Sequence, residues 1–207
     1  MKTASTATLT MLLVLLLSAC ASSPDSRFYT LTATASQGVP AVDGKTPSIA
    51  IVSLTIPELV DRPQLVARTS VSRVELLETH RWAEPLKSAI ARTIAENLSR
   101  LLASDRVSYY PQAASLLADF KINVDMSRFE FTGDHVELDA AWTIRRADDS
   151  PAGSGRSQMR EVVTGSGYDA VAQSFSRGLA GISREMVKEL KLDGSPGALP
   201  SVLPLLK

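Results

Sequence analysis

The chain has very little of the chemistry that most enzymes and metal proteins use. Its 207 residues include one cysteine and two histidines. A single cysteine excludes an internal disulfide framework, and so few thiol and imidazole groups leave too few ligands for a His/Cys zinc site. We therefore expect no disulfide, no metal and no cofactor.

An excess of charge of either sign is also missing. Lys and Arg number 22 and Asp and Glu number 22, so the formal net charge is zero. This balance lacks the basic excess of a nucleic-acid-binding domain. Apolar residues make up 44% of the chain and charged residues 21%, which favours a packed core over disorder. The length suits one domain with tails.

Long apolar runs are absent as well. Leu9 to Leu17 is apolar except for Thr10, whereas a membrane-spanning helix needs about 20 apolar residues. A run of this length at the start of the chain, after a single Lys, is typical of the apolar region of a secretory signal.

The run ends at Leu17-Ser18-Ala19-Cys20, which resembles a bacterial lipobox. In such signals the thiol receives a diacylglycerol, the peptide is cut before the cysteine, and the new amino terminus receives a further acyl group such as palmitate. We therefore expect a signal peptide over 1–19, a lipid on Cys20 and a lipidated tether over 20–26. The alternative is a cysteine buried in a leucine-rich helix. By resemblance to enterobacterial sorting signals, Ala21 favours the outer membrane.

Two segments have the helical period of an amphipathic helix, at 83–102 and 169–190. Alternation of apolar and polar residues predicts a long hairpin over 120–144, with a turn at 132–135 and a bulge at Ser127-Arg128.

Further strands are predicted at 27–31, 48–56, 65–68, 72–77, 106–110 and 156–164. Loops are expected at 32–47 and 147–155, where Gly and Pro gather. We predict one α/β domain over 27–192, with a mixed sheet, an antiparallel hairpin or meander and two helices packed on it. The tail over 193–207 is rich in Pro and Leu and shows no period, so we expect it to be flexible, with partner binding as the alternative.

Catalytic groups are scarce. His135 follows Asp134 in the predicted hairpin turn, where we expect a solvated residue, and we expect His80 to be a simple surface residue. Neither stands in a nucleophile motif, and the chain has no G-x-S-x-G and no phosphate-binding loop. We predict no catalytic residues and a protein that is not an enzyme, although a hydrolase that uses one of the histidines remains an alternative.

Two motifs stand out. In the first, over 57–68, Asp61 and Arg62 either organise a turn or face a partner, and Pro63 begins an edge strand. In the second, over 78–86, we expect Trp82 to plug the core where a strand meets a helix. Arg81 beside it is suited to stacking or ion pairing, and Trp and Arg are also enriched at interface hot spots.

A lipobox, then Phe28-Tyr29-Thr30-Leu31, then P-x-x-x-D-R-P-Q-L-V-x-R, then R-W-A-E-P-L together resemble the ABC-type transport auxiliary lipoproteins, the PqiC-like family. The resemblance implies a non-catalytic docking component at the outer membrane. Its partners would be MCE-domain proteins of an intermembrane lipid transport system, and copies of it would associate into a ring. The alternative is a structural or assembly lipoprotein of another envelope complex.

The resemblance also implies which residues shape the domain and its subunit or partner contacts. They are Asp61, Arg62, Pro63, Gln64, Arg81 and Trp82.

Overall fold

A computed structural model of the protein describes residues 25–38 and 47–190. The expected signal peptide, Cys20 with its lipid, most of the tether and the tail over 193–207 lie outside the described residues.

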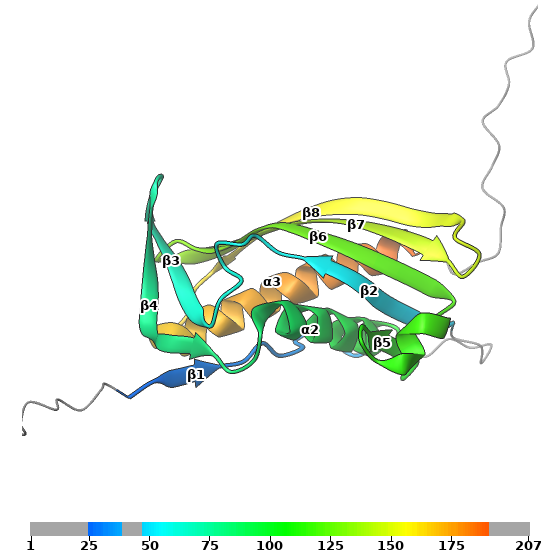
Figure 1. Ribbon diagram of the computed structural model, residues 1–207, viewed down its shortest axis with the longest axis horizontal. Helices are drawn as coiled ribbons and strands as arrows, with labels where there is room; N and C mark the ends of the chain where they lie inside the picture. Colours follow the sequence, from blue (N-terminus) through cyan, green and yellow to red (C-terminus); the bar gives the residue numbers. More distant parts are fainter. Residues whose placement is uncertain (1–24, 39–46, 191–207) are drawn as a thin grey trace, which may run out of the picture.

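Within the described residues, eight strands form one sheet, and two long helices and a short 3-10 helix accompany it (Figure 1). The strands are β1 (Arg27–Tyr29), β2 (Ile49–Thr55), β3 (Gln64–Ser70), β4 (Arg73–Trp82), β5 (Val107–Tyr109), β6 (Phe120–Phe131), β7 (His135–Arg146) and β8 (Pro151–Val162). The helices are α2 (Leu86–Leu101), η1 (Ala113–Leu117) and α3 (Gly167–Glu189).

Strand β6 is the centre of the sheet. One of its edges pairs with β2 and, at its far end, with β3, so that the strand order is β1-β4-β3-β6-β2-β5. Its other edge pairs with β7, and β7 pairs with β8. The β2, β5 and β6 pairings are parallel, and the β6–β7–β8 meander is antiparallel. The prediction of a single α/β domain with a mixed sheet is confirmed.

The β6–β7 hairpin follows the predicted alternation. Phe120, Ile122, Val124 and Met126 are buried, and the register shifts between Met126 and Arg128. The expected bulge is therefore present. It restores the inward direction of Phe129 after two successive polar residues.

The predicted turn over 147–155 is too long, because β8 already begins at Pro151. Strand β8 pairs only with β7, and an edge strand tolerates proline. Two of its glycines are required because neighbouring atoms leave no room for a side chain. A Cβ on Gly155 would lie 2.5 Å from Cζ2 of Trp142, and one on Gly153 would lie 2.7 Å from the carbonyl oxygen of Glu189.

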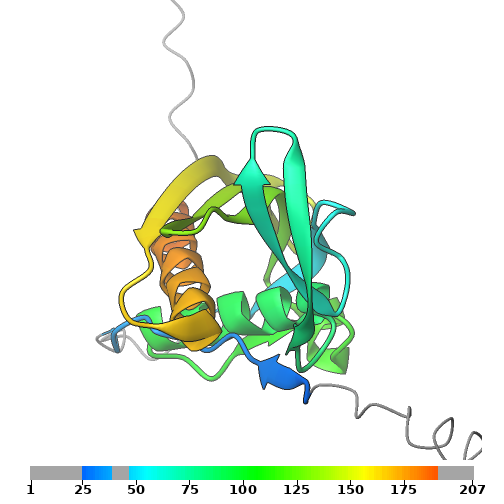
Figure 2. The same cartoon turned by 90° about the vertical axis from the view of Figure 1, so that its left-hand side faces the viewer.

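Helices α2 and α3 pack side by side against the inner face of the sheet (Figures 1 and 2). The α2 stripe of Leu86, Ile90, Ile94 and Leu98 is fully buried. The expected start of this helix at 83 was early, since Pro85 is extended, with φ −53° and ψ 124°, and precedes the first helical residue.

The described part of the predicted loop, 32–38, is an extended segment that crosses α2 and α3 on the side away from the sheet (Figure 2). Alternate residues Leu31, Ala33 and Ala35 are buried. The amides of Thr34 and Ala35 donate to Oδ1 of Asn97 over 3.0 and 2.9 Å. As predicted, these residues form neither helix nor strand, and their small side chains let the segment lie close to both helices.

Candidate interface at the β3–β4–α2 junction

The two motifs of the sequence meet at one place. Gln64 at the start of β3 pairs with Arg81 near the end of β4. Beside this pair the amide of Trp82 donates to the carbonyl of Pro63 over 2.7 Å. This bond uses the carbonyl of residue 63, which proline retains, and does not need the N–H that proline lacks. Segments about twenty residues apart are thereby joined.

Strand β4 is bulged at this point. Gln64 pairs with Arg81 while Leu65 pairs with Leu77, so residues 78–80 bulge out of the β3 pairing. The side-chain amide of Gln64 bridges the bulge by donating to Oε2 of Glu78 over 3.0 Å. Past the bulge, one edge of β4 pairs with β3 again, and its opposite edge pairs with another strand.

That other strand is β1, which runs parallel to the end of β4. Phe28 is the register partner of Arg81, and Tyr29 that of Trp82. The amide of Ala83 then donates to the carbonyl of Tyr29 over 2.9 Å. All three motifs within the described residues that carry the family resemblance therefore converge on one junction.

Trp82 is the apolar centre of the junction and is only 6% exposed. Its ring lies edge-on to Phe129 and Phe175, with centroids 6.3 and 6.0 Å away. Phe129 and Phe175 are stacked at 4.0 Å. These contacts join β4, β6 and α3, and they confirm the predicted core role of Trp82.

An open pocket of about 410 Å³ lies over this centre and is called the junction pocket here. Its lining comes from both motifs: Asp61, Arg62, Pro63, Trp82, Ala83, Glu84, Pro85 and Leu86. Asp61 is exposed and Arg62 half-buried at its rim. Within the described residues, neither Nε of Arg62 nor Nε of Arg81 has a hydrogen-bond partner. The junction therefore combines an apolar floor with two arginines whose buried Nε atoms lack a hydrogen-bond partner among the described residues, and of these Arg62 lines the pocket.

The second motif is tied to α2 by an arginine that sequence reasoning missed. Arg92 donates to Glu84 over 2.6 Å, to Glu96 over 3.0 Å and to the carbonyl of Leu31 over 3.0 Å. The hydrogen bond to Glu84 is the main cause that raises the pKa of Arg92. Only its i,i+4 spacing from Glu96 is visible in the sequence. The contacts to Glu84 and Leu31 depend on the fold.

His80 is not the simple surface residue that was expected. Its Nδ1 shares a 2.6 Å hydrogen bond with the hydroxyl of Tyr29, and its ring centroid lies 4.2 Å from that of Tyr168. Burial is the main cause that raises the pKa of Tyr29, followed by the charge of Asp169. The histidine thus belongs to an aromatic cluster that fastens β1 to β4 and α3.

The expectation that His135 is solvated was wrong, because it is 8% exposed. Its ring nitrogens lie between Asp134 and Glu137, with Nε2 3.1 Å from Oε1 of Glu137. Its hydrogen bond lowers the pKa of Asp134. The pKa of Glu137 is lowered mainly by its hydrogen bond with Arg128 and then by that with His135. The nearby hydroxyl of Thr132 donates to the carbonyl of His135, so the group closes the hairpin turn.

Across the described ranges, no set of three or more His, Cys, Asp or Glu side chains is arranged to hold a metal ion. No helix in these ranges is both long and apolar enough to cross a membrane.

No curated protein matches the chain. Among solved structures, one of a protein from Xanthomonas campestris aligns with a TM-score of 0.62 at 15% identity, covering 78% of this chain and 92% of that one. Another, of an uncharacterized protein, aligns with a TM-score of 0.61 at 18% identity, covering 80% and 98%. At these identities the likeness shows the fold alone.

Residues 29–187 match the model of a family described as the ABC-type transport auxiliary lipoprotein component. The matched range spans most of the chain and includes the whole junction. The description is that of an auxiliary part of a transporter rather than an enzyme, and a lipoprotein role of this kind implies a location in the cell envelope. The chain belongs to the family of ABC-type transport auxiliary lipoproteins.

Proposed function

We propose that this protein is an outer-membrane lipoprotein that acts as a non-catalytic docking component of an MCE-type intermembrane lipid transport system. The family match over residues 29–187 carries the proposal. The convergence of the family-like motifs around the junction pocket supports it, because it gives one surface on which partner contacts can concentrate.

The anchor in this proposal is a lipid on Cys20, which would face the domain towards the periplasm. Several acyl chains on one residue hold a protein on a bilayer stably, since two anchoring signals suffice. Confinement to the surface raises the effective concentration of the domain for partner docking and for association with its own copies into a ring. Both kinds of contact would use the junction.

Replacing the thiol tests the anchor. The variant Cys20→Ser should lose incorporation of labelled fatty acid and accumulate as an unprocessed precursor, whereas Ser22→Ala should be labelled normally. Normal labelling of Cys20→Ser would contradict the anchor.

The partner is tested by site-specific photo-crosslinking in intact envelopes. A photoreactive residue at Arg62 samples the rim of the junction pocket, and one at Thr143, exposed on β7, samples a remote face. We expect an MCE-domain protein to be crosslinked from position 62 and not from 143. Products with other copies of this chain would report self-association.

Failure to recover an MCE-domain protein from position 62 would count against the proposal. If a different envelope complex is crosslinked instead, the chain is a structural or assembly lipoprotein of that complex.

Substitutions separate a role in docking from a role in folding. Arg62→Ala should keep the unfolding free energy and lose the crosslinked product, because the side chain is partly exposed where it lines the pocket. Arg156→Ala, on the exposed face of β8, is the matched control and should retain both. If Arg62→Ala unfolds the protein, Arg62 acts in the fold and not at the interface.

A further inference from the structure

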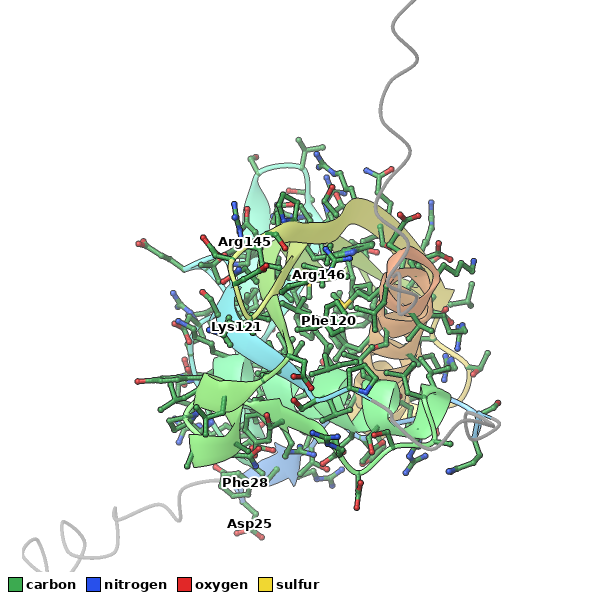
Figure 3. All side chains as sticks on the ribbon, turned by 90° about the vertical axis from the view of Figure 1, so that its right-hand side faces the viewer. Asp25, Phe28, Phe120, Lys121, Arg145 and Arg146 are labelled. Carbon is green, nitrogen blue, oxygen red and sulfur yellow. The ribbon has the colours of Figure 1, made fainter. Side chains whose placement is uncertain are left out.

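An aromatic side chain stands uncovered on the first strand. Phe28 is 62% exposed, whereas its neighbour Tyr29 is buried. The two side chains point to opposite faces of β1, as in any strand. Within the described residues β1 pairs only with β4, so nothing covers the outer ring. Figure 3 shows Phe28 and Asp25 at the foot of the domain, directed away from the helices.

Phe28 lies close along the chain to Cys20, the proposed site of lipid attachment. Only five peptide units separate Asp25, the first described residue, from Cys20. A fully extended chain covers at most about 3.6 Å per residue, which places Asp25 within about 18 Å of Cys20. If Cys20 carries acyl chains at the bilayer surface, β1 cannot lie far from that surface.

The neighbour of Phe28 suits the same surface. Arg81 is its register partner across the parallel pair, so both side chains lie on the same face of the sheet. Arg81 is partly exposed, and its Nε is buried without a hydrogen-bond partner among the described residues. Guanidinium groups bind phosphate oxygens through charge-assisted hydrogen bonds, and apolar side chains such as Phe enter the boundary between the lipid headgroups and the acyl chains.

We propose that the β1 face of the domain rests on the phospholipid surface, with the ring of Phe28 inserted among the headgroups and Arg81 directed at lipid phosphate. The inference rests on the proposed lipid anchor at Cys20 and goes beyond it by fixing the orientation of the domain. Strands β6, β7 and β8 lie on the opposite side of the helices from β1 (Figures 1 and 2). The outer surface of β6, β7 and β8 therefore faces away from the bilayer.

The scarcity of cysteine makes a direct test possible. In the lipidated protein the thiol of Cys20 carries the lipid, so a newly introduced cysteine is the single site at which an environment-sensitive fluorophore can be attached. The label is placed by Phe28→Cys and, as controls, by Leu117→Cys and Thr143→Cys, which are exposed positions away from β1. Each full-length lipidated protein is reconstituted in phosphatidylethanolamine–phosphatidylglycerol vesicles.

We expect the label at position 28 to be quenched by spin-labelled lipid and protected from aqueous iodide, with a blue-shifted emission. The label at 143 should show the reverse. Adding Arg81→Gln should reduce the lipid quenching at 28 in these anionic vesicles while the protein stays anchored.

Equal access of iodide to positions 28 and 143 would overturn the inference. Protection at 28 that appears only at high protein density would also overturn it, because a second copy would then cover the ring. Mass spectrometry of Cys20 separates these outcomes from failure of the proposed function. A protein without acyl chains disproves the anchor, whereas an acylated protein with position 28 in water disproves only the orientation.

Discussion

The β3–β4–α2 junction and the end of the molecule that carries η1 are built in opposite ways. At the junction the largest ring, Trp82, is buried, and Arg92 ties three segments together. At the η1 end, the side chains of Tyr110, Leu116 and Leu117 are 64%, 67% and 87% exposed. The motifs that carry the family resemblance thus supply contacts that hold the fold, although Phe28 in the first of them is 62% exposed, whereas the η1 end gathers three exposed apolar side chains.

The η1 end is joined to the sheet by polar contacts. The carboxylate of Asp119, just after η1, accepts hydrogen bonds from the amide of Ser48 over 2.8 Å and from its hydroxyl over 2.7 Å. A pocket of about 360 Å³ lies along β2 and is lined in part by Leu54, Ala91 and Tyr110. Because apolar side chains are buried at the junction and exposed at the η1 end, we expect the junction to contribute more to stability.

The largest expected effect is at the junction centre. Trp82→Ala should lower the unfolding free energy by about 3–5 kcal/mol, since it removes the ring that Phe129 and Phe175 pack against. Urea denaturation followed by circular dichroism measures this loss. A loss below about 1 kcal/mol, the size of an average substitution, would mean that the junction is no more a folding centre than the rest of the domain.

The next effect concerns the polar tie. Arg92→Met keeps the length of the side chain but removes three hydrogen bonds and leaves Glu84 and the carbonyl of Leu31 without this donor, at a cost of about 1–3 kcal/mol. Lys188→Met is the matched control. Its exposed pair with Glu185 should contribute below about 1 kcal/mol. Equal losses in the two variants would show that Arg92 does not tie the junction.

At the η1 end the expected effect depends on pH. The hydrogen bonds from Ser48 lower the pKa of Asp119, that of its amide being the largest cause. A lowered pKa means that the ionised form stabilises the fold above the ordinary pKa of the carboxyl, and that this contribution is lost as the pH falls through the folded pKa. Asp119→Asn should therefore be less stable than wild type at pH 7.

That difference should shrink below about pH 4, near the ordinary aspartate pKa. NMR titration of the Asp119 carboxyl and of the Ser48 amide would follow the same proton. A difference in stability that is constant from pH 7 to pH 2 would show that the charge of Asp119 is not the cause.

The smallest effect is expected on the exposed face of η1. Leu116→Ser and Leu117→Ser should change the unfolding free energy by no more than about 0.5 kcal/mol each, as surface substitutions do. Thermal denaturation of these two variants and of Trp82→Ala, measured under the same conditions, compares the smallest expected loss of stability with the largest. A loss at η1 near that of Trp82→Ala would erase the contrast between the two ends.

Much of the fold was predictable because its signals are local. The helical periods gave α2 and α3, and alternation gave the β6–β7 hairpin together with its bulge. Where the predictions failed, residues that are typical of turns were present for reasons of tertiary packing. Gly153 and Gly155 suggest a turn until Trp142 and the end of α3 are seen beside them.

The candidate site shows the same division. Its residues were chosen from the order of motifs along the chain, and Trp82 was expected in the core. Arg92 and the cluster around His80 were missed, because their partners lie between eight and about ninety residues away. No periodicity links such pairs.

What the sequence alone determined is what short-range physics can express: the amphipathic elements, the scarcity of cysteine and histidine, and the motifs of the family. The tertiary structure decided which of those motifs touch. Strand β4 lies between β3 and β1 and pairs with both at Arg81, and these two pairings set Pro63, Trp82 and Tyr29 side by side. Strand pairing between distant segments depends on backbone hydrogen bonds that every residue can offer, so only the folded chain specifies it.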